Sequence, residues 1–278
     1  MLTCDVNELK KIVMFKTIFS QLFTIFLITP SLLTANPATA NTAVQMSQQK
    51  YQMTITQLAE NVYQHVSYKH VNNYGMVPAS GLIVLDGKNA HIIDTPWTQA
   101  DTKRLLAWLM AQGLTAKSSI STHFHDDRAS GIFYLNKLSI DTYASKLTNQ
   151  LLENDKKTAA KHDLLLNDGQ VHKQTLVNGT IEVFYPGAGH SPDNIVVWLP
   201  EHQLLFGGCF VKSLHSKTLG YTGDADIAQW PASMQNLMNK YSSAKLVVPG
   251  HGKIGDISLL AHTLALSIKA NKDIALSK

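Results

Sequence analysis

Apolar and polar side chains alternate along several short segments of the chain, and this period of two is typical of β-strands that bury one face. Two of these segments, Gly81–Leu85 and Ala90–Asp94, lie on either side of Asp86-Gly87-Lys88-Asn89, a strong turn signal, and are predicted to pair as a hairpin. Met53–Leu58 and Val62–Lys69 are predicted to form another hairpin. The strands predicted from the whole pattern are Met53–Leu58, Val62–Lys69, Gly81–Leu85, Ala90–Asp94, Lys117–Ser121, Ile181–Tyr185, Ile195–Leu199, Leu204–Gly207 and Lys245–Val248.

Other segments have the apolar spacing of helices that bury one face. The clearest runs from Thr98 to Gln112, with Leu105, Trp108 and Leu109 on one face and a glycine directly after it. The remaining predicted helices are Ser145–Asn154, Gln229–Tyr241 and a segment from Asp256 onward. Two rounds of strands followed by helices predict an α/β fold in which two sheets pack together with helices outside. Because no linker-like stretch divides the chain after residue 50, we expect a single domain over residues 41–278.

The N-terminal segment has the pattern of a secretory signal peptide. Three lysines precede an apolar run, Ile18–Leu33, and Ala38-Thr39-Ala40 follows it as a small-x-small cleavage site. The run is only about 16 residues long, which argues against the alternative of a retained membrane anchor. We expect residues 1–40 to be removed, with Met14 as an alternative translation start. The mature protein would then begin near Asn41 and be exported to the periplasm.

Composition excludes one class of function and draws attention to two residue types. The formal charge of +4 over 278 residues is small, and the basic residues form no stripe, so nucleic-acid binding is not expected. Twelve histidines are unusually many for this length. Of the two cysteines, Cys4 leaves with the signal peptide, so the exported chain keeps only Cys209. A lone thiol in an oxidising compartment is either buried and inert or held by a metal, and Cys209 alone does not decide between these.

Six potential metal ligands lie close after predicted strands: His123, His125, Asp127, His190, Cys209 and His251. Residues two apart in an extended segment point to the same side, so His123, His125 and Asp127 can face one pocket. The other three ligands lie beside glycines, which allow a close approach to a bound ion.

Six ligands are too many for one tetrahedral zinc site. Divided three and three, they form two sites that each leave a position open for solvent, which is the catalytic arrangement. We expect His123, His125 and His190 in one site and Asp127, Cys209 and His251 in the other. Imidazole and thiolate ligands favour zinc over magnesium or calcium, so two Zn²⁺ ions per chain are predicted. The other eight histidines are interpreted as surface or packing residues.

This arrangement resembles the metallo-β-lactamases of subclass B1. The resemblance covers nearly the whole mature chain and rests further on Asp94-Thr95-Pro96-Trp97, Gly189–Asn194, Gly207-Gly208-Cys209 and Val248–Gly252. Related hydrolases that act on thioesters or lactones typically have a histidine directly after the aspartate of H-x-H-x-D, where this chain has Arg128. The resemblance implies a four-layer αββα sandwich of two mixed β-sheets with outer helices and the metals at one edge.

The resemblance also implies an activity, the hydrolysis of the ring amide of penicillins, cephalosporins and carbapenems, and with it antibiotic resistance. A hydroxide held between two zinc ions would attack the lactam carbonyl, and the second zinc would stabilise the nitrogen anion. Asp127 would be the catalytic residue that orients this hydroxide. Two alternatives are a thioester or lactone hydrolase, against which Arg128 and Lys212 argue, and a secreted zinc-binding protein without activity, against which two open sites argue.

Three further residues are expected to bind substrate on the same resemblance. Lys212 occupies the position that holds the substrate carboxylate, although a lone lysine is usually solvated. Trp97 corresponds to an aromatic on the pocket floor or is a core residue, and Tyr68–Val77 corresponds to a flap above it. Tyr221 stands where many relatives have an asparagine that assists the oxyanion, so that role falls to zinc or to the tyrosine hydroxyl. Ser130 replaces a frequent glycine. The expected partner is a small β-lactam, and the expected state is a monomer.

Overall fold

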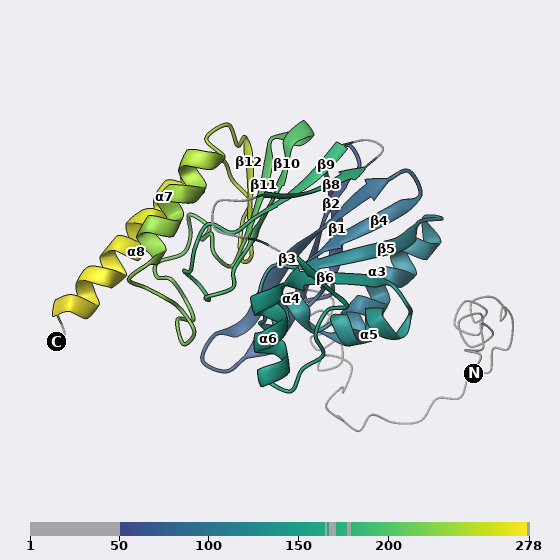
Figure 1. Cartoon of the computed structure of the whole chain (residues 1–278), viewed down its shortest axis with the longest axis horizontal. Coiled ribbons are helices and arrows are strands. Elements are labelled where there is room, and N and C mark those ends of the chain that lie inside the picture. The colour runs from purple at the N-terminus through teal and green to yellow at the C-terminus, as the bar shows by residue number, and fades with distance from the viewer. Residues whose placement is uncertain (1–50, 165, 167–170, 177–178, 277–278) are drawn as a thin grey trace, which may run out of the picture. The chain divides into compact units, whose positions relative to one another are not determined.

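Two β-sheets make up the centre of the molecule (Figure 1). The computed structural model describes residues 51–164, 166, 171–176 and 179–276, so the predicted signal peptide and Asn41 lie outside the described residues. The first sheet has seven strands in chain order: β1 (Thr54–Ala59), β2 (Val62–Val71), β3 (Gly75–Asp86), β4 (Asn89–Ile93), β5 (Thr115–Ser121), β6 (Asp141–Ser145) and β7 (His162–Leu164). The second sheet has the order β12-β11-β10-β9-β8, formed by β8 (Val171–Leu176), β9 (Gly179–Phe184), β10 (Val196–Leu199), β11 (Leu204–Gly208) and β12 (Leu246–Pro249).

Both sheets are mixed. The predicted hairpins β1–β2 and β3–β4 are antiparallel, whereas β4, β5, β6 and β7 run parallel to one another. In the second sheet β11 and β12 are parallel and the other pairs are antiparallel. The carboxyl ends of neighbouring parallel strands lie at the same sheet edge, and this is where the candidate ligands follow.

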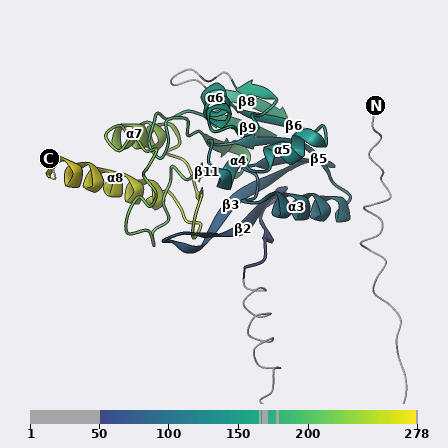
Figure 2. The same ribbon diagram turned by 90° about the horizontal axis from the view of Figure 1, so that it is seen from below.

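Helices cover the outer faces of the two sheets. They are α3 (Gln99–Ala111), α4 (Asp126–Ala129), α5 (Ile132–Lys137), α6 (Lys146–Asn154), α7 (Trp230–Lys240) and α8 (Ser258–Leu276), with a short 3-10 turn η1 (Pro200–His202). Leu105 and Leu109 of α3 pack on Ile83 and Ile92 of the first sheet. Helices α7 and α8 cover the second sheet and lie on the side of the molecule opposite to α3 (Figure 2).

Apolar side chains from both sheets share one buried core. It includes Leu82, Ile93 and Ile120 of the first sheet and Val197, Phe206 and Val248 of the second. Burial of apolar surface between two sheets is the main stabilising contribution in such a sandwich. The predicted α/β sandwich, with the four-layer arrangement implied by the resemblance, is therefore confirmed.

The predicted strands and helices are present, although several ends differ. Strand β3 begins at Gly75, six residues before the predicted Gly81, so the predicted flap Tyr68–Val77 is the far end of the β2–β3 hairpin. Pro78 lies in this part of β3 and interrupts the alternation from which the strand was predicted. Helices α4 and α5 and strands β6, β7 and β8 were not predicted from the sequence. No helix in the described part of the chain has the length and apolar character needed to cross a membrane.

Candidate metal centre

Three histidine rings converge beyond the end of β5. Nε2 of His123 lies 3.1 Å from Nδ1 of His125, which lies 3.2 Å from Nε2 of His190. His123 and His190 are buried, and His125 is partly exposed. His190 comes from the loop between β9 and β10, on the other sheet. The structure thus brings together the three histidines that were predicted for one site.

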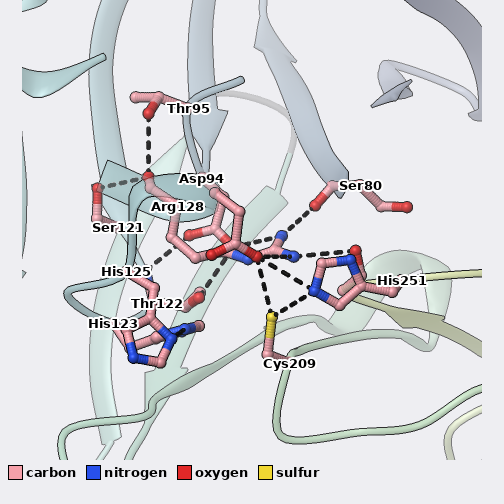
Figure 3. Close-up of polar contacts among 12 residues, drawn as sticks. Ser80, Asp94, Thr95, Ser121, Thr122, His123, His125, Arg128, Cys209 and His251 are labelled. Atoms are coloured by element: carbon pink, nitrogen blue, oxygen red, sulfur yellow. Dashed lines mark hydrogen bonds and ion pairs between the residues drawn. The ribbon is translucent and has the colours of Figure 1, made fainter. Parts of the chain in front are cut away.

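A second cluster lies beside the first and joins residues from both sheets. Sγ of Cys209 lies 3.2 Å from Oδ2 of Asp127 and 3.2 Å from Nε2 of His251, and these last two atoms are also 3.2 Å apart. Cys209 directly follows β11, and His251 comes two residues after β12 ends at Pro249. These are the three residues that were predicted for the other site, and Figure 3 shows Cys209 and His251 turned toward each other.

The route by which Asp127 reaches this cluster differs from the prediction. Alternation of side chains in an extended segment was expected to bring Asp127 to the same side as His123 and His125. Instead the extended segment ends at His125, the N-cap residue of α4, and Asp127 lies within this helical turn. The turn directs its carboxylate toward Cys209 and His251. Asp127 does share a pocket with His123, as expected, but the strand geometry assumed for it ends where the chain begins to coil.

Both clusters fit a metal ion in their spacing. Ligands at the corners of a tetrahedral zinc site, bound at about 2.0–2.3 Å, are about 3.3–3.7 Å apart. The observed separations of 3.1–3.2 Å are close to this range. Groups of histidine, aspartate and cysteine that could hold an ion are found at His123, His125 and His190, and at His123, Asp127 and Cys209.

The protonation of the histidines also suits metal binding. Burial lowers the pKa of His123 and of His190 well below the ordinary value, so both rings are neutral and keep a lone pair for a ligand. Burial by itself would also lower the pKa of His251, but the negative charge of Cys209 and the hydrogen bond with Asp127 raise it to about 9. A cluster that stabilises a proton this strongly is one that attracts a cation.

His251 is held by a backbone contact that orients its ring. Nδ1 of His251 donates a hydrogen bond to the carbonyl oxygen of Pro78 over 2.6 Å, which leaves Nε2 facing Cys209 and Asp127. A backbone carbonyl in this position fixes the tautomer of a metal-binding histidine. The contact also connects the end of β12 to the flap hairpin.

Arg128 lies beside Asp127 of the second cluster, in a role that was not predicted from the sequence. Its guanidinium is fully buried, 2.8 Å from Oδ2 of Asp127 and 3.2 Å from Oδ2 of Asp94 (Figure 3). It also donates hydrogen bonds to the carbonyl oxygens of Ser80 and Gly250. Arg128 therefore connects both sheets under the centre. Its place directly after the H-x-H-x-D motif, together with Asp94 in the D-T-P-W motif, was the available signal.

Electrostatics explain how this buried network keeps its charges. Burial tends to raise the pKa of Asp127, but Arg128 and the neighbouring histidines hold it well below the usual range. The ionised form of Asp94 is less favoured. Burial raises its pKa to about 7, against the opposing effect of Arg128 and of hydrogen bonds from Thr122. Asp127 is therefore the carboxylate that stays ionised and available as a ligand.

The predicted substrate-binding residues surround the two clusters. Lys212 is buried, with Nζ 5.3 Å from the ring centre of Trp230, and burial lowers its pKa to about 8. The Trp97 ring is partly buried and lies 5.9 Å from the ring of His251. Tyr221 is exposed, and its ring packs edge-on against His125 at 5.7 Å.

Ser130, which the resemblance did not explain, has a structural role. Its hydroxyl donates hydrogen bonds to the carbonyl oxygens of Pro96 and Trp97 at 3.0 and 2.8 Å. It thereby holds the loop that carries Trp97. Next to this loop is a cavity of about 490 Å³ whose lining includes Trp97, Lys69, Asp126 and Lys157.

Two of the remaining histidines are packing residues, as interpreted from the sequence. Nε2 of the buried His65 lies 2.9 Å from the carbonyl oxygen of Asp94, and Nδ1 of the buried His91 lies 2.7 Å from the Ser118 hydroxyl. Among the described residues, neither belongs to a group that could hold a metal ion.

A sandwich of two mixed sheets with two adjacent histidine, aspartate and cysteine clusters at its edge defines a class of metal-dependent hydrolases. A sequence model of the metallo-beta-lactamase superfamily matches residues 74–251, and the chain belongs to this superfamily. The metallo-beta-lactamase type 2 of Pseudomonas aeruginosa is 47% identical over 221 residues, which cover 80% of this chain and 87% of that protein. The corresponding protein of Bacteroides fragilis is 36% identical, with 76% and 84% covered.

Solved structures agree with these sequence relatives. The crystal structure of VMB-1 is 53% identical and has a TM-score of 0.75, with 80% of this chain and 99% of that chain covered. The structure of the DIM-1 metallo-beta-lactamase exposed to ceftazidime is 52% identical and has a TM-score of 0.75, with 79% and 98% covered. The family and the enzyme class predicted from the sequence are thereby confirmed.

Proposed function

We propose that this protein is a zinc-dependent β-lactamase that holds two Zn²⁺ ions and opens the ring amide of penicillins, cephalosporins and carbapenems. The observation that carries the proposal is the pair of three-residue clusters, one of three histidines and one of Asp127, Cys209 and His251, side by side at the sheet edge. Its closely similar relatives are named as metallo-β-lactamases, and one crystal structure is of the enzyme exposed to ceftazidime. Such an enzyme would make its host resistant to these antibiotics.

The donor set supports zinc as the metal. Calcium and magnesium prefer oxygen ligands, whereas the two clusters contain four imidazoles, one thiolate and one carboxylate. His123, His125 and His190 would hold one ion, and Asp127, Cys209 and His251 the other. Three protein ligands at each site leave room for solvent and substrate.

Zinc in such sites supplies a water-derived nucleophile at neutral pH and polarises the carbonyl group under attack. The chain's own residues would then orient the reactants. Asp127, whose charge is maintained by Arg128, would accept a hydrogen bond from the attacking water and fix its direction. No serine nucleophile is needed in this scheme.

Substrate orientation would depend on Lys212 and Trp97. β-Lactams carry a carboxylate next to the ring nitrogen, and Lys212, three residues after Cys209, interacts electrostatically with Cys209 and Asp127 of the second cluster. Trp97, next to His251, offers an apolar surface to the ring system. Tyr221 supplies no amide donor where many relatives have an asparagine, so we assign oxyanion stabilisation to the metal.

We further propose that the protein acts in the periplasm as a monomer, after cleavage behind Ala40. The charged and apolar pattern of the first 40 residues supports export. N-terminal sequencing of the purified enzyme should read from Asn41 or within a few residues of it. A start before Ile18 would contradict this.

The proposed activity is tested with one penicillin, one cephalosporin and one carbapenem. Purified protein with two bound zinc ions should hydrolyse all three, a chelator should abolish hydrolysis, and added Zn²⁺ should restore it. Clavulanate, which targets serine enzymes, should have no effect. A preparation that binds two zinc ions and cleaves thioesters or lactones but no β-lactam would refute the proposal.

A further inference from the structure

The cavity of about 490 Å³ beside Trp97 is adjacent to both candidate metal sites. The described residues that line it lie within residues 69–158, the part of the chain that forms the first sheet and its helices. Trp97 forms part of its wall and also lies 5.9 Å from the ring of His251. Asp126, another lining residue, stands in the chain between one candidate ligand of each site. A molecule bound at the metals would therefore reach this cavity.

Positive charge exceeds negative charge around the cavity. The charged residues in its described lining are three lysines, Lys69, Lys156 and Lys157, and one aspartate, Asp126. One oxygen of Asp126 lies 3.5 Å from Nζ of Lys69, and the other lies 3.2 Å from Nζ of Lys157. Asp155 also pairs with Lys157, at 3.1 Å. Three ammonium groups thus face two carboxylates, and one positive charge is left over.

The ion pairs hold the ammonium groups in place but leave them accessible. The side chains of Lys69 and Lys157 are 43% and 36% exposed, and Lys156 is exposed as well. A lysine ammonium has three N–H donors. Lys69 and Lys157 can therefore each donate a further hydrogen bond while they keep their contact with Asp126. An anion could bind here without breaking these pairs.

Apolar side chains form the rest of the cavity. Trp97, Phe133 and Leu152 belong to its lining, and the Phe133 ring is 40% exposed. Apolar walls with a few placed polar groups are typical of sites for small organic ligands. A small polar anion would leave these walls uncovered. The lining therefore fits a ligand that carries an aromatic ring next to its negative charge.

The proposed substrate would place such a group in this direction. In penicillins and cephalosporins the ring carboxylate is next to the lactam nitrogen, whereas the acylamino side chain is on the carbon next to the carbonyl. The two groups therefore point away from opposite sides of the four-membered ring. Lys212, which would hold the ring carboxylate, follows β11 of the second sheet. The acyl side chain would then point toward the first sheet, where the cavity lies.

We propose that the cavity is a subsite for the acyl side chain and that Lys69 and Lys157 select β-lactams whose side chain carries a second carboxylate. Asp126 is a positioning residue in this subsite, because it holds both ammonium groups at the cavity. The inference rests on the proposed function and names a class of its substrates, the dicarboxylate β-lactams.

Two penicillins that differ in one group provide the test. Carbenicillin is benzylpenicillin with a second carboxylate on the carbon next to the phenyl ring. The measured quantity is kcat/KM for carbenicillin divided by kcat/KM for benzylpenicillin. Lys69→Gln and Lys157→Gln should each lower this ratio by about two- to fivefold, the effect of a half-exposed ion pair, mainly through the KM of carbenicillin. Ampicillin, which has an ammonium group on the same carbon, should change in the opposite direction.

Three further measurements separate charge recognition from a general structural effect. Lys69→Arg keeps the charge and should keep the wild-type ratio. Asp126→Asn frees both ammonium groups and should raise the ratio, whereas added salt should lower it in the wild type. The matched control is Lys88→Gln, at an exposed lysine in the turn before β4, at the sheet edge opposite to the candidate ligands. It should leave the ratio unchanged.

The proposal is overturned if both glutamine variants keep the wild-type ratio, or if Lys69→Arg loses as much as Lys69→Gln. If neither penicillin is hydrolysed, the proposed function fails, and the same ratio is measured on the dissociation constants of the intact penicillins by NMR titration of the zinc-loaded protein. Tighter binding of carbenicillin that is lost in Lys69→Gln would then still support the subsite. Equal binding of both penicillins would refute it.

Discussion

The Arg128 guanidinium lies between the carboxylates of Asp94 and Asp127, and all three side chains are buried. Two buried carboxylates this close would repel each other and favour protonation. The guanidinium offsets that repulsion. Its contacts with two carboxylates and two backbone carbonyls replace the hydrogen bonds that it would make with water. A residue next to a ligand therefore controls the charge state of that ligand.

Arg128→Met tests this at the residue scale. The substitution keeps most of the side-chain volume but leaves two buried carboxylates without a cation, and breaking a buried pair in this way costs about 3–5 kcal/mol. For a chain of this size the Tm should fall by on the order of 10 °C, measured by thermal unfolding followed by circular dichroism. Arg104→Met, at an exposed arginine that pairs with Asp101 on α3, is the control and should change Tm little. Equal Tm values for the two variants would contradict the role assigned to Arg128.

Lys212 allows a test of the substrate class. Burial lowers its pKa to about 8, so the ammonium is largely charged at neutral pH and becomes neutral as the pH rises through 8. A charge-assisted contact is worth roughly 1.5–3 kcal/mol, so Lys212→Met should lower kcat/KM for carboxylate-bearing β-lactams at least about tenfold. Wild-type KM should rise above pH 8, whereas the KM of the variant should lose this dependence.

Zinc content should be unchanged in Lys212→Met, because Lys212 is not among the predicted ligands. Lys217→Met, at an exposed lysine five residues further on, is the matched control and should behave like the wild type. If both variants kept full activity toward carboxylate-bearing substrates, Lys212 would have no part in substrate binding.

At the scale of elements, the site depends on how closely the ends of β11 and β12 approach. The backbone N–H of Gly250 donates to the carbonyl oxygen of Gly208 over 2.7 Å, and its own carbonyl accepts from Ser80 of β3. A Cβ at Gly250 would come within 2.7 Å of the Arg128 guanidinium and of the Cys209 backbone nitrogen. Only glycine allows the two strands to carry Cys209 and His251 at this separation.

Gly250→Ala should therefore weaken the second metal site as well as the fold. The neighbours of the added methyl group are backbone atoms and a fixed guanidinium, so the strand ends must separate. We expect zinc analysis by atomic absorption to fall from two ions per chain toward one, with a lower Tm. Thr98→Ala removes the N-cap of α3 and costs about 1 kcal/mol, so it lowers Tm through another element and should keep both zinc ions. Two retained zinc ions in Gly250→Ala would contradict this account of the strand ends.

At the scale of the whole molecule, the two candidate metal sites join the two halves of the chain. His123, His125 and Asp127 follow the first sheet, whereas His190, Cys209 and His251 follow strands of the second. Each cluster contains residues from both halves. A bound ion is therefore a cross-link between sheets that otherwise adhere through their shared apolar core.

Metal removal should for this reason lower the stability of the entire sandwich. Binding to the folded state alone stabilises it by about 4 kcal/mol when the free ligand is at 1,000 times its Kd. We expect chelation to lower the Tm clearly in wild-type protein, measured by calorimetry. The decrease should be smaller in Cys209→Ser, where a hydroxyl has replaced a thiolate and the second ion is already bound weakly. Identical Tm values with and without chelator would show that the clusters do not connect the sheets through metal.

Much of this protein could be predicted from local sequence alone. The alternation in the strands, the apolar face of α3 and the turn after Asp86 are properties of neighbouring residues, and they determine which elements form. The candidate ligands were recognisable because each follows a strand within a distinctive short motif. Their division into two groups of three could be inferred because a zinc ion accepts few ligands.

Tertiary structure alone decided how the ligands are oriented and charged. Helix α4 directs Asp127 away from the line of His123 and His125. It could not be predicted, because a segment of four residues is too short to show a helical period. Arg128 gains its role from Asp94 and Gly250, and Asp126 contacts Lys69, which precedes it by 57 residues. These contacts depend on which strand ends meet when the two sheets pack, and that packing is determined by the burial of apolar surface across the whole domain.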